Sequence, residues 1–243
     1  MSPRKFEDCI GKKGRPFTGA EYLESLRDGR EVWIYGERVE DVTAHPAFRN
    51  AARSLARLYD ALHDEKHKAV LTCPTDTGSG GFTHRFFRVG RSREDLLAQR
   101  EAIAHWARMT YGWMGRTPDY KAALMNTLGA NFAFYDKFAD NAKAWYKRAQ
   151  ENVLFMNHAI VNPPVDRGKP AEQVKDIFIA IQKETDAGVY VSGAKVVATS
   201  SALTHYNFLG QNAAMPINDS DLAIMFIAPM NAPGVKLLCR TSY

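Results

Sequence analysis

Two places in the sequence carry side chains that can hold an anionic oxygen. Arg116 precedes Thr117-Pro118, a pair typical of a helix start, and Tyr120 falls in the first turn of the expected helix. The free N–H groups of a helix N-terminus favour negative charge, so this position outlines an anion site. A phenolate, a carboxylate or a phosphate would satisfy it equally well. The alternative is a surface arginine beside a packed tyrosine.

The third candidate side chain is His158, in an apolar run that predicts a buried strand and ends at Pro163-Pro164. One interpretation is a core histidine whose ring binds a backbone carbonyl. If His158 instead faces the same cleft as Arg116 and Tyr120, the three donors could hold a phenol hydroxyl and stabilise its ionised form. A phenol site therefore requires that the fold bring these three residues together.

The elements that must position these residues change character near Asn157–Arg167. Amphipathic helical patterns precede this segment, as in the helices expected after the capping-box spacing of Thr18 and Glu21, after Pro46 and after the cap residue Ser92. Short β-branched runs separated by Gly, Pro and Asp follow it. We predict an α+β chain with a mainly helical N-terminal domain over residues 1–152 and a middle antiparallel β domain over residues 153–243. Clefts often form where two such domains meet.

Four strands are expected after the segment Asn157–Arg167, in two antiparallel pairs. The first pair is Val174–Glu184 with Val189–Thr199, broken by a bend at Ser192-Gly193, and the second is Leu222–Ala228 with Val235–Cys239. In the first half, Phe82–Val89 alternates like a strand. The glycine-rich segment before it is therefore interpreted as a flexible loop and not as a phosphate-binding loop.

Composition excludes several classes of protein. The 243 residues are 45% hydrophobic and 24% charged, which is typical of a soluble globular protein. The net charge is +5, but basic and acidic residues alternate along most helical stretches, which argues against nucleic-acid binding. Three scattered cysteines without a CxxC spacing fit free thiols in a reducing cytoplasm. No apolar run suits a signal peptide or a membrane span, so we expect a cytoplasmic protein without membrane contact.

His63 and His67 stand four residues apart, so they could place two metal ligands on one helical face. The glutamate between them is one position too late for the zinc-protease motif. Because the surroundings are charged, we interpret this segment as a solvated helix end. No metal site is expected.

Three segments carry motifs of a known family. They are Gly-Trp-Met-Gly-Arg-Thr-Pro-Asp-Tyr-Lys-Ala at 112–122, Asn-His-Ala-Ile-Val-Asn-Pro-Pro-Val-Asp-Arg at 157–167 and Lys-Glu-Thr-Asp-Ala-Gly…Val-Ser-Gly-Ala-Lys-Val-Val-Ala-Thr at 183–199. Together they resemble the oxygenase components of 4-hydroxyphenylacetate 3-monooxygenases, and the resemblance runs from about Arg15 to Tyr243. It implies an acyl-CoA dehydrogenase-like architecture: a helical domain, a middle β domain and a C-terminal helical bundle that forms homotetramers. The bundle is absent here, so we expect this chain to be incomplete.

The same resemblance implies a two-component flavin monooxygenase. Reduced FAD from a separate NAD(P)H-flavin reductase would react with O₂ and hydroxylate a para-substituted phenol, such as 4-hydroxyphenylacetate, next to its hydroxyl group. Arg116, Tyr120 and His158 match the family's catalytic and substrate-binding positions. The positions that match flavin contacts are His158, Ala159, Ile160, Arg167 and Thr199. The chain has no nicotinamide-binding fingerprint, in agreement with a reductant prepared elsewhere.

Two other functions stay open on the sequence. One is an acyl-CoA-handling flavoprotein of the dehydratase or dehydrogenase type, which would need a catalytic carboxylate from outside this chain. The other is an inactive truncated fragment. The loop around Gly210–Ser220 is expected to influence which para substituent is accepted.

Overall fold

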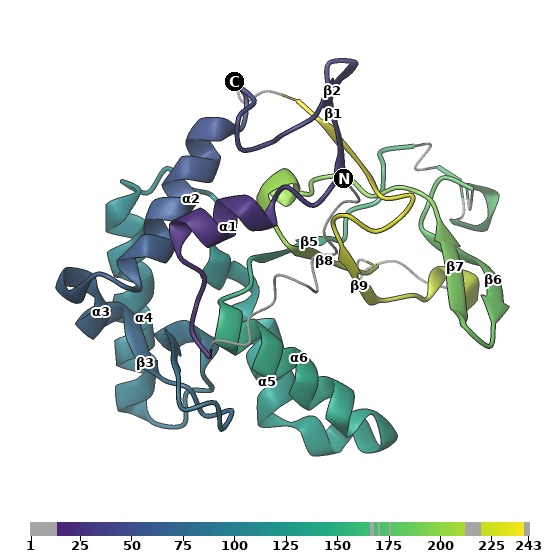
Figure 1. The fold of residues 1–243 in the computed structure, drawn as a ribbon. Coiled ribbons are helices and arrows are strands. Elements are labelled where there is room, and N and C mark those ends of the chain that lie inside the picture. Colours follow the sequence, from purple (N-terminus) through teal and green to yellow (C-terminus); the bar gives the residue numbers. More distant parts are fainter. Residues whose placement is uncertain (1–13, 166–167, 170, 175, 212–219, 241–243) are drawn as a thin grey trace.

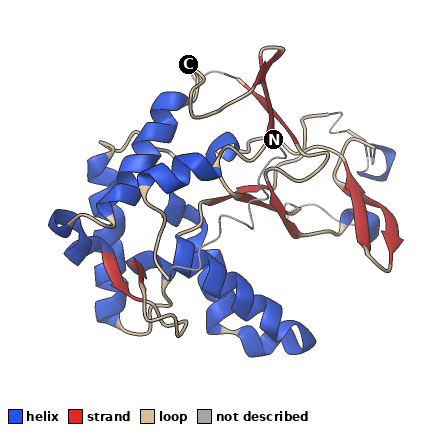
Figure 2. Ribbon diagram, viewed as in Figure 1, coloured by secondary structure: helices blue, strands red, loops and turns tan. Residues whose placement is uncertain are grey.

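The computed structural model describes residues 14–165, 168–169, 171–174, 176–211 and 220–240. Helices fill one side of the molecule, and most of the strands lie on the other side (Figure 2). The predicted α+β class is therefore confirmed.

Six α-helices are the main elements of the described residues 14–152. The α-helices are α1 (Gly19–Ser25), α2 (Arg49–Ala61), α3 (Glu65–Leu71), α4 (Arg93–Met109), α5 (Ala122–Ala130) and α6 (Ala139–Asn152). Two of the predicted N-caps are confirmed: Thr18 forms a capping box with Glu21, and the Ser92 hydroxyl accepts a hydrogen bond from the Asp95 N–H at 3.1 Å. Figure 1 shows α5 and α6 as a pair that projects from the rest of the helices.

Short 3-10 turns and strands connect these helices. They are β1 (Glu31–Ile34), β2 (Glu37–Val39), β3 (Thr72–Pro74), β4 (Phe82–His84), η2 (Arg85–Phe87), η3 (Pro118–Lys121) and η4 (Phe132–Phe138). The strand predicted for Phe82–Val89 is wrong beyond His84, because the His84 ring accepts a hydrogen bond from the Phe86 N–H at 3.2 Å and the chain turns into η2. The helix predicted after Thr117 starts as η3 and continues as α5, and Thr117 makes no capping hydrogen bond.

The second half holds a mixed sheet and a hairpin. Its elements are β5 (Met156–Ala159), η5 (Ala171–Val174), β6 (Ala180–Thr185), β7 (Gly188–Ser192), η6 (Ser201–Leu203), β8 (Tyr206–Leu209), η7 (Ser220–Leu222), β9 (Phe226–Pro229) and β10 (Lys236–Cys239). The sheet has the order β5-β8-β9, with β5 parallel to β8 and β9 antiparallel to β8. The strands of this half are therefore not purely antiparallel.

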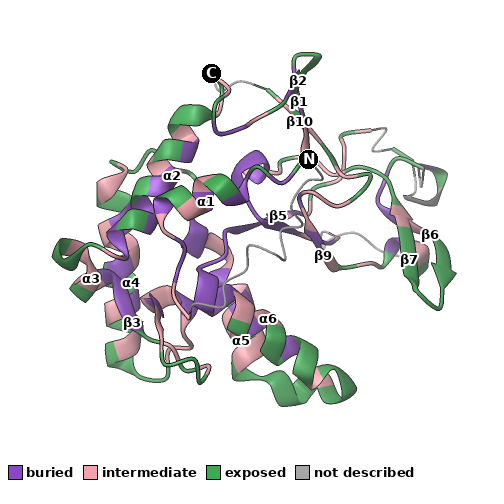
Figure 3. Cartoon of the chain, viewed as in Figure 1, coloured by how far each residue is buried: buried purple, intermediate pink, exposed green. Residues whose placement is uncertain are grey.

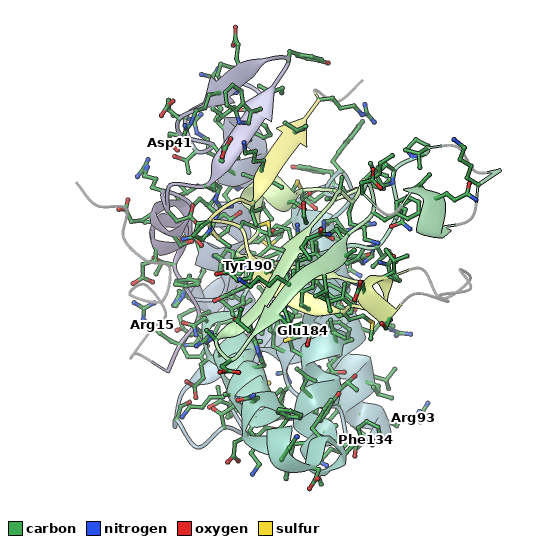
Figure 4. All side chains as sticks on the ribbon, turned by 90° about the vertical axis from the view of Figure 1, so that its right-hand side faces the viewer. Arg15, Asp41, Arg93, Phe134, Glu184 and Tyr190 are labelled. Carbon is green, nitrogen blue, oxygen red and sulfur yellow. The ribbon has the colours of Figure 1, made fainter. Side chains whose placement is uncertain are left out.

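The first predicted strand pair is confirmed in its central part, as the hairpin β6–β7. The hairpin crosses the front of the molecule in Figure 4, where Glu184 and Tyr190 mark its two strands. The bend expected at Ser192-Gly193 also occurs: Gly193 adopts a φ of +127°, and a Cβ there would lie 2.2 Å from the Phe178 carbonyl oxygen. The remainder of the predicted strand, residues 194–199, forms no regular ladder and makes isolated bridges, of Ala194 with Phe178 and of Val196 with Val161.

The second predicted pair is wrong, because β9 and β10 do not pair with each other. β9 joins β8, and β10 lies parallel to β1, with Leu237 opposite Val32 and Cys239 opposite Ile34. This partner lets Leu237 and Cys239 pack against the main hydrophobic core, to which β1 contributes two buried side chains. The pairing also joins the two ends of the described chain.

The main core continues across the predicted domain boundary at residue 152. It includes Leu55 and Trp106 from the helices together with Val153–Met156 and Tyr206. Buried residues concentrate where the helices meet β5, whereas the far ends of the α5–α6 pair and of the β6–β7 hairpin are exposed (Figure 3). The division into two domains stays a prediction.

A strained residue leads from α6 into β5, the strand that carries His158. Val153 ends α6 with a φ of +53°, a left-handed conformation that β-branched residues rarely adopt. It is held there by complete burial and by the Tyr59 hydroxyl, which donates a hydrogen bond to the Val153 carbonyl at 2.7 Å. The direction in which β5 leaves the helix therefore depends on packing against α2.

Candidate phenol site

The fold brings together the three residues on which the predicted site depends. The ring centroids of Tyr120, in η3, and His158, in β5, are 5.6 Å apart. The Arg116 guanidinium carbon lies 4.0 Å from the centroid of the Tyr120 ring. All three side chains are only partly exposed. The three residues therefore lie close together, and their assignment to a phenol site stays a prediction.

Four buried polar atoms at and around this cluster have no hydrogen-bond partner in the described part of the chain. They are Arg116 Nε, Asp119 Oδ1, Asn157 Oδ1 and His158 Nδ1. The Arg116 side chain donates a hydrogen bond to the neighbouring Gly115 carbonyl, at 2.7 Å. Because an unsatisfied buried polar group costs about 1–3 kcal/mol, such atoms nearly always have a partner. A polar ligand bound at the cluster would supply partners for Arg116 Nε and His158 Nδ1.

The electrostatics of the cluster keep the histidine neutral near pH 7. Burial lowers the pKa of His158, and the positive charges of Lys121 and Arg116 lower it further. A neutral imidazole can accept a proton from a ligand hydroxyl. The pKa of the Asp119 carboxyl is raised by its burial.

Lys121 belongs to the cluster, although the sequence reasoning did not select it. Its ammonium nitrogen lies 4.9 Å from the centroid of the Tyr120 ring. Burial lowers the pKa of Lys121, and the charge of Arg116 lowers it further. The sequence feature that could have indicated this is the position of Lys121 next to Tyr120, at the same expected helix start.

Four of the five residues predicted to contact flavin lie in β5 or close to it. Ala159 is buried in β5, and Ile160, which follows it, is partly exposed. Thr199 is an exposed residue, but its carbonyl accepts a hydrogen bond from the Asn157 side-chain amide. Arg167 lies outside the described residues, as does most of the loop at Gly210–Ser220.

The two histidines considered as metal ligands do not face one another. The ring of His63 contacts the Phe17 carbonyl at 3.1 Å, whereas His67 is hydrogen-bonded to His105 across α3 and α4 at 2.9 Å. No group of three or more potential ligands that could hold a metal ion occurs among the described residues. Across the same part of the chain, none of the helices combines the length and the apolar character needed to cross a membrane.

Comparisons with known proteins agree with the motifs. The oxygenase component of 4-hydroxyphenylacetate 3-monooxygenase from Pseudomonas aeruginosa is 65% identical over 240 residues, which is 98% of this chain and 46% of that protein. The oxygenase component of 4-nitrophenol 2-monooxygenase from a Rhodococcus species is 58% identical over 229 residues, or 94% of this chain and 44% of that protein. This chain thus spans about half the length of these relatives.

A solved structure shows similarity to the same group of oxygenase components. The crystal structure of the oxygenase component of 4-hydroxyphenylacetate 3-monooxygenase, complexed with FAD and 4-hydroxyphenylacetate, matches with a TM-score of 0.84 at 32% identity. The match covers 92% of this chain and 47% of that one. The family model described as "4-hydroxyphenylacetate 3-hydroxylase N terminal" matches residues 18–243. On this match and on the identity to its relatives, the chain belongs to the 4-hydroxyphenylacetate 3-hydroxylase family, of which it represents the N-terminal part.

Proposed function

We propose that the protein is the oxygenase component of a two-component flavin monooxygenase that converts a para-substituted phenol to a catechol. The observation that carries this proposal is the convergence of Arg116, Tyr120 and His158 around unsatisfied buried polar atoms. The relatives named for 4-hydroxyphenylacetate and 4-nitrophenol support a phenol with a polar para substituent as the substrate.

In this proposal the three residues bind the phenol oxygen and increase its negative charge. Arg116 attracts the developing phenolate, Tyr120 donates a hydrogen bond to it, and the unpartnered Nδ1 of His158 accepts the phenol proton. Ionisation enriches electron density at the ring carbon next to the oxygen, and that carbon is the one to be hydroxylated. Loss of one hydrogen bond to a charged group removes about 1.5–3 kcal/mol of this stabilisation.

Reduced FAD, when bound, would activate O₂ and supply the oxygen atom that enters the ring. We assign its contacts to His158, Ala159, Ile160, Arg167 and Thr199. The buried Asn157 Oδ1, whose side chain also contacts Thr199, has no partner in the described part of the chain and fits a ligand that offers an N–H donor, as the flavin ring does. His158 would therefore lie where the substrate and the flavin meet.

Further parts of the proposal concern partners and location. A separate NAD(P)H-flavin reductase would deliver the reduced flavin, in agreement with the term "oxygenase component" in the names of the relatives. A homotetramer and a cytoplasmic location complete the proposal. Cys73 and Cys239 are free thiols, which supports a reducing compartment.

Product analysis tests this function. The protein is mixed with chemically reduced FAD, O₂ and 4-hydroxyphenylacetate, and the products are separated by chromatography and identified by mass spectrometry. We expect a catechol that carries one additional oxygen atom derived from O₂. If the protein binds neither the phenol nor FAD and forms no catechol, the proposal is wrong.

A further inference from the structure

Lys121 and Arg116 place two positive charges beside one tyrosine ring. The Lys121 ammonium nitrogen and the Arg116 guanidinium carbon lie 4.9 Å and 4.0 Å from the centroid of the Tyr120 ring. Both distances are within the range of favourable cation–π contacts. His158 packs against the same ring from β5. Lys121 is therefore part of the cluster and not a separate surface lysine.

No acidic side chain of the described residues forms an ion pair with either cation. Asp119, the one carboxyl within η3, is buried, and burial raises the pKa of that carboxyl. Among the described residues, the charged and aromatic groups near His158 are thus the two cations of the segment 116–121 and the Tyr120 ring. The cluster carries positive charge that the described part of the protein does not neutralise.

Two partly buried cations that repel each other raise the free energy of the empty site. This repulsion contributes to the lowered pKa of Lys121. An anionic atom bound between them would relieve it, because each cation would then gain an opposite charge in a medium less polar than water. The arrangement therefore favours the ionised form of a bound ligand over its neutral form.

We propose that Lys121 is a second cation of the phenol site and that its ammonium group stabilises the bound phenolate together with Arg116. This inference rests on the proposed function, and it adds a residue to the three already assigned. The two cations of the site would then differ in their chemistry. Arg116 presents a planar guanidinium, whereas Lys121 carries a flexible amine whose charge depends on its surroundings.

The ionisation of bound 4-nitrophenol provides a direct test without flavin. Its phenolate absorbs visible light and its neutral form does not, so a pH titration with saturating protein gives the apparent pKa of the bound phenol. We expect the unaltered chain to lower this pKa. Lys121→Gln should raise it again by about one unit, since one opposite charge at close range shifts a pKa by roughly 1–3 units and Lys121 is only partly buried. Lys121→Arg should retain the shift.

Lys143 provides a matched control. Its ammonium nitrogen lies 4.5 Å from the centroid of the Phe132 ring, so it is also a lysine over an aromatic ring, but it is exposed on α6. Lys143→Gln should leave the apparent pKa of bound 4-nitrophenol unchanged. Circular dichroism and thermal unfolding of each variant verify the fold, and Lys121→Met provides a second neutral variant if Lys121→Gln is unstable.

The outcomes separate the two claims. If 4-nitrophenol binds and is ionised equally by the unaltered chain and by the neutral Lys121 variants, the role of Lys121 is wrong and the proposed function stands. The same holds if those variants lose affinity only for 4-hydroxyphenylacetate, because Lys121 would then contact the carboxylate, which 4-nitrophenol lacks. If the unaltered chain binds neither 4-nitrophenol nor 4-hydroxyphenylacetate, both claims fail.

Discussion

Arg30→Met should strongly destabilise the protein, because Arg30 joins the first strand to the second half of the chain. Its guanidinium makes two hydrogen bonds of 2.8 Å to the Asp28 carboxylate. It also donates to the carbonyl oxygens of Ala202 at 2.9 Å and Thr204 at 2.8 Å. The Arg30 and Asp28 side chains are only 3% and 4% exposed. The substitution would leave a buried carboxylate without a counter-charge and two carbonyls without these donors.

The expected magnitude follows from this geometry. Removal of one partner of a buried ion pair costs about 3–5 kcal/mol, and we expect a loss of this size in the free energy of unfolding. For a chain of this length the melting temperature would fall by roughly 10 °C, at about 2–4 °C for each kcal/mol. Removal of both charges by Asp28→Leu with Arg30→Met should be less damaging than Arg30→Met alone, since no isolated charge would remain buried.

Urea denaturation followed by circular dichroism measures these differences. Arg27→Met is the matched control: Arg27 also pairs with two carboxylates, Glu24 at 2.9 Å and Asp41 at 3.0 Å, but its side chain is 49% exposed. Exposed pairs contribute about 0–1 kcal/mol, so this variant should lose little stability. If Arg30→Met and Arg27→Met lost equal stability, or if the double variant were worse than Arg30→Met, the assigned role of the buried pair would be refuted.

Two further predictions concern the site and its surroundings. Arg116→Ala should reduce the rate of catechol formation roughly 10- to 100-fold, since it removes one charge-assisted contact of about 1.5–3 kcal/mol. The affinity for FAD, measured by fluorescence, should change little. An unchanged rate would remove Arg116 from the mechanism. Burial lowers the pKa values of His84 and His205 to about 3, so their ring protons should not titrate between pH 5 and 8 in NMR spectra. Because their unfolded pKa is about 6.5, their neutral form contributes stability above that pH, and this stability should be lost as the pH falls from about 6.5 towards 3. A titration of either ring near pH 6.5 would contradict the burial assigned to it.

Local features were accessible from the sequence because they involve neighbours three or four positions apart. The capping box at Thr18 and the cap at Ser92 are examples, since each joins a side chain to a backbone group within one helical turn. The bend at Gly193 was expected as well, since glycine adopts its conformation without steric cost. Arg116 and Tyr120 could be assigned to one site because a single turn of chain separates them.

The pairing of strands that lie far apart in the sequence could not be predicted. β10 could have paired with β9 or with a distant edge strand, and its apolar residues suit either arrangement. It lies on β1, about 200 residues away, because the core beside β1 can bury Leu237 and Cys239. The roles of Arg30 and of Val153 could not be predicted either, because their partners Ala202 and Tyr59 are remote in the sequence.

The amino-acid sequence by itself determined the family, the positions of most helices and the residue types that can bind a phenol, because these depend on motifs and on contacts within a few residues. The tertiary structure alone decided that His158 lies against Tyr120 and that Lys121 joins Arg116 beside the same ring. The physical reason is that the burial of a side chain, and the charges that surround it, depend on how the helices and strands pack together. The distance between two charges, and the polarity of the medium between them, exist only after β5 has packed against η3.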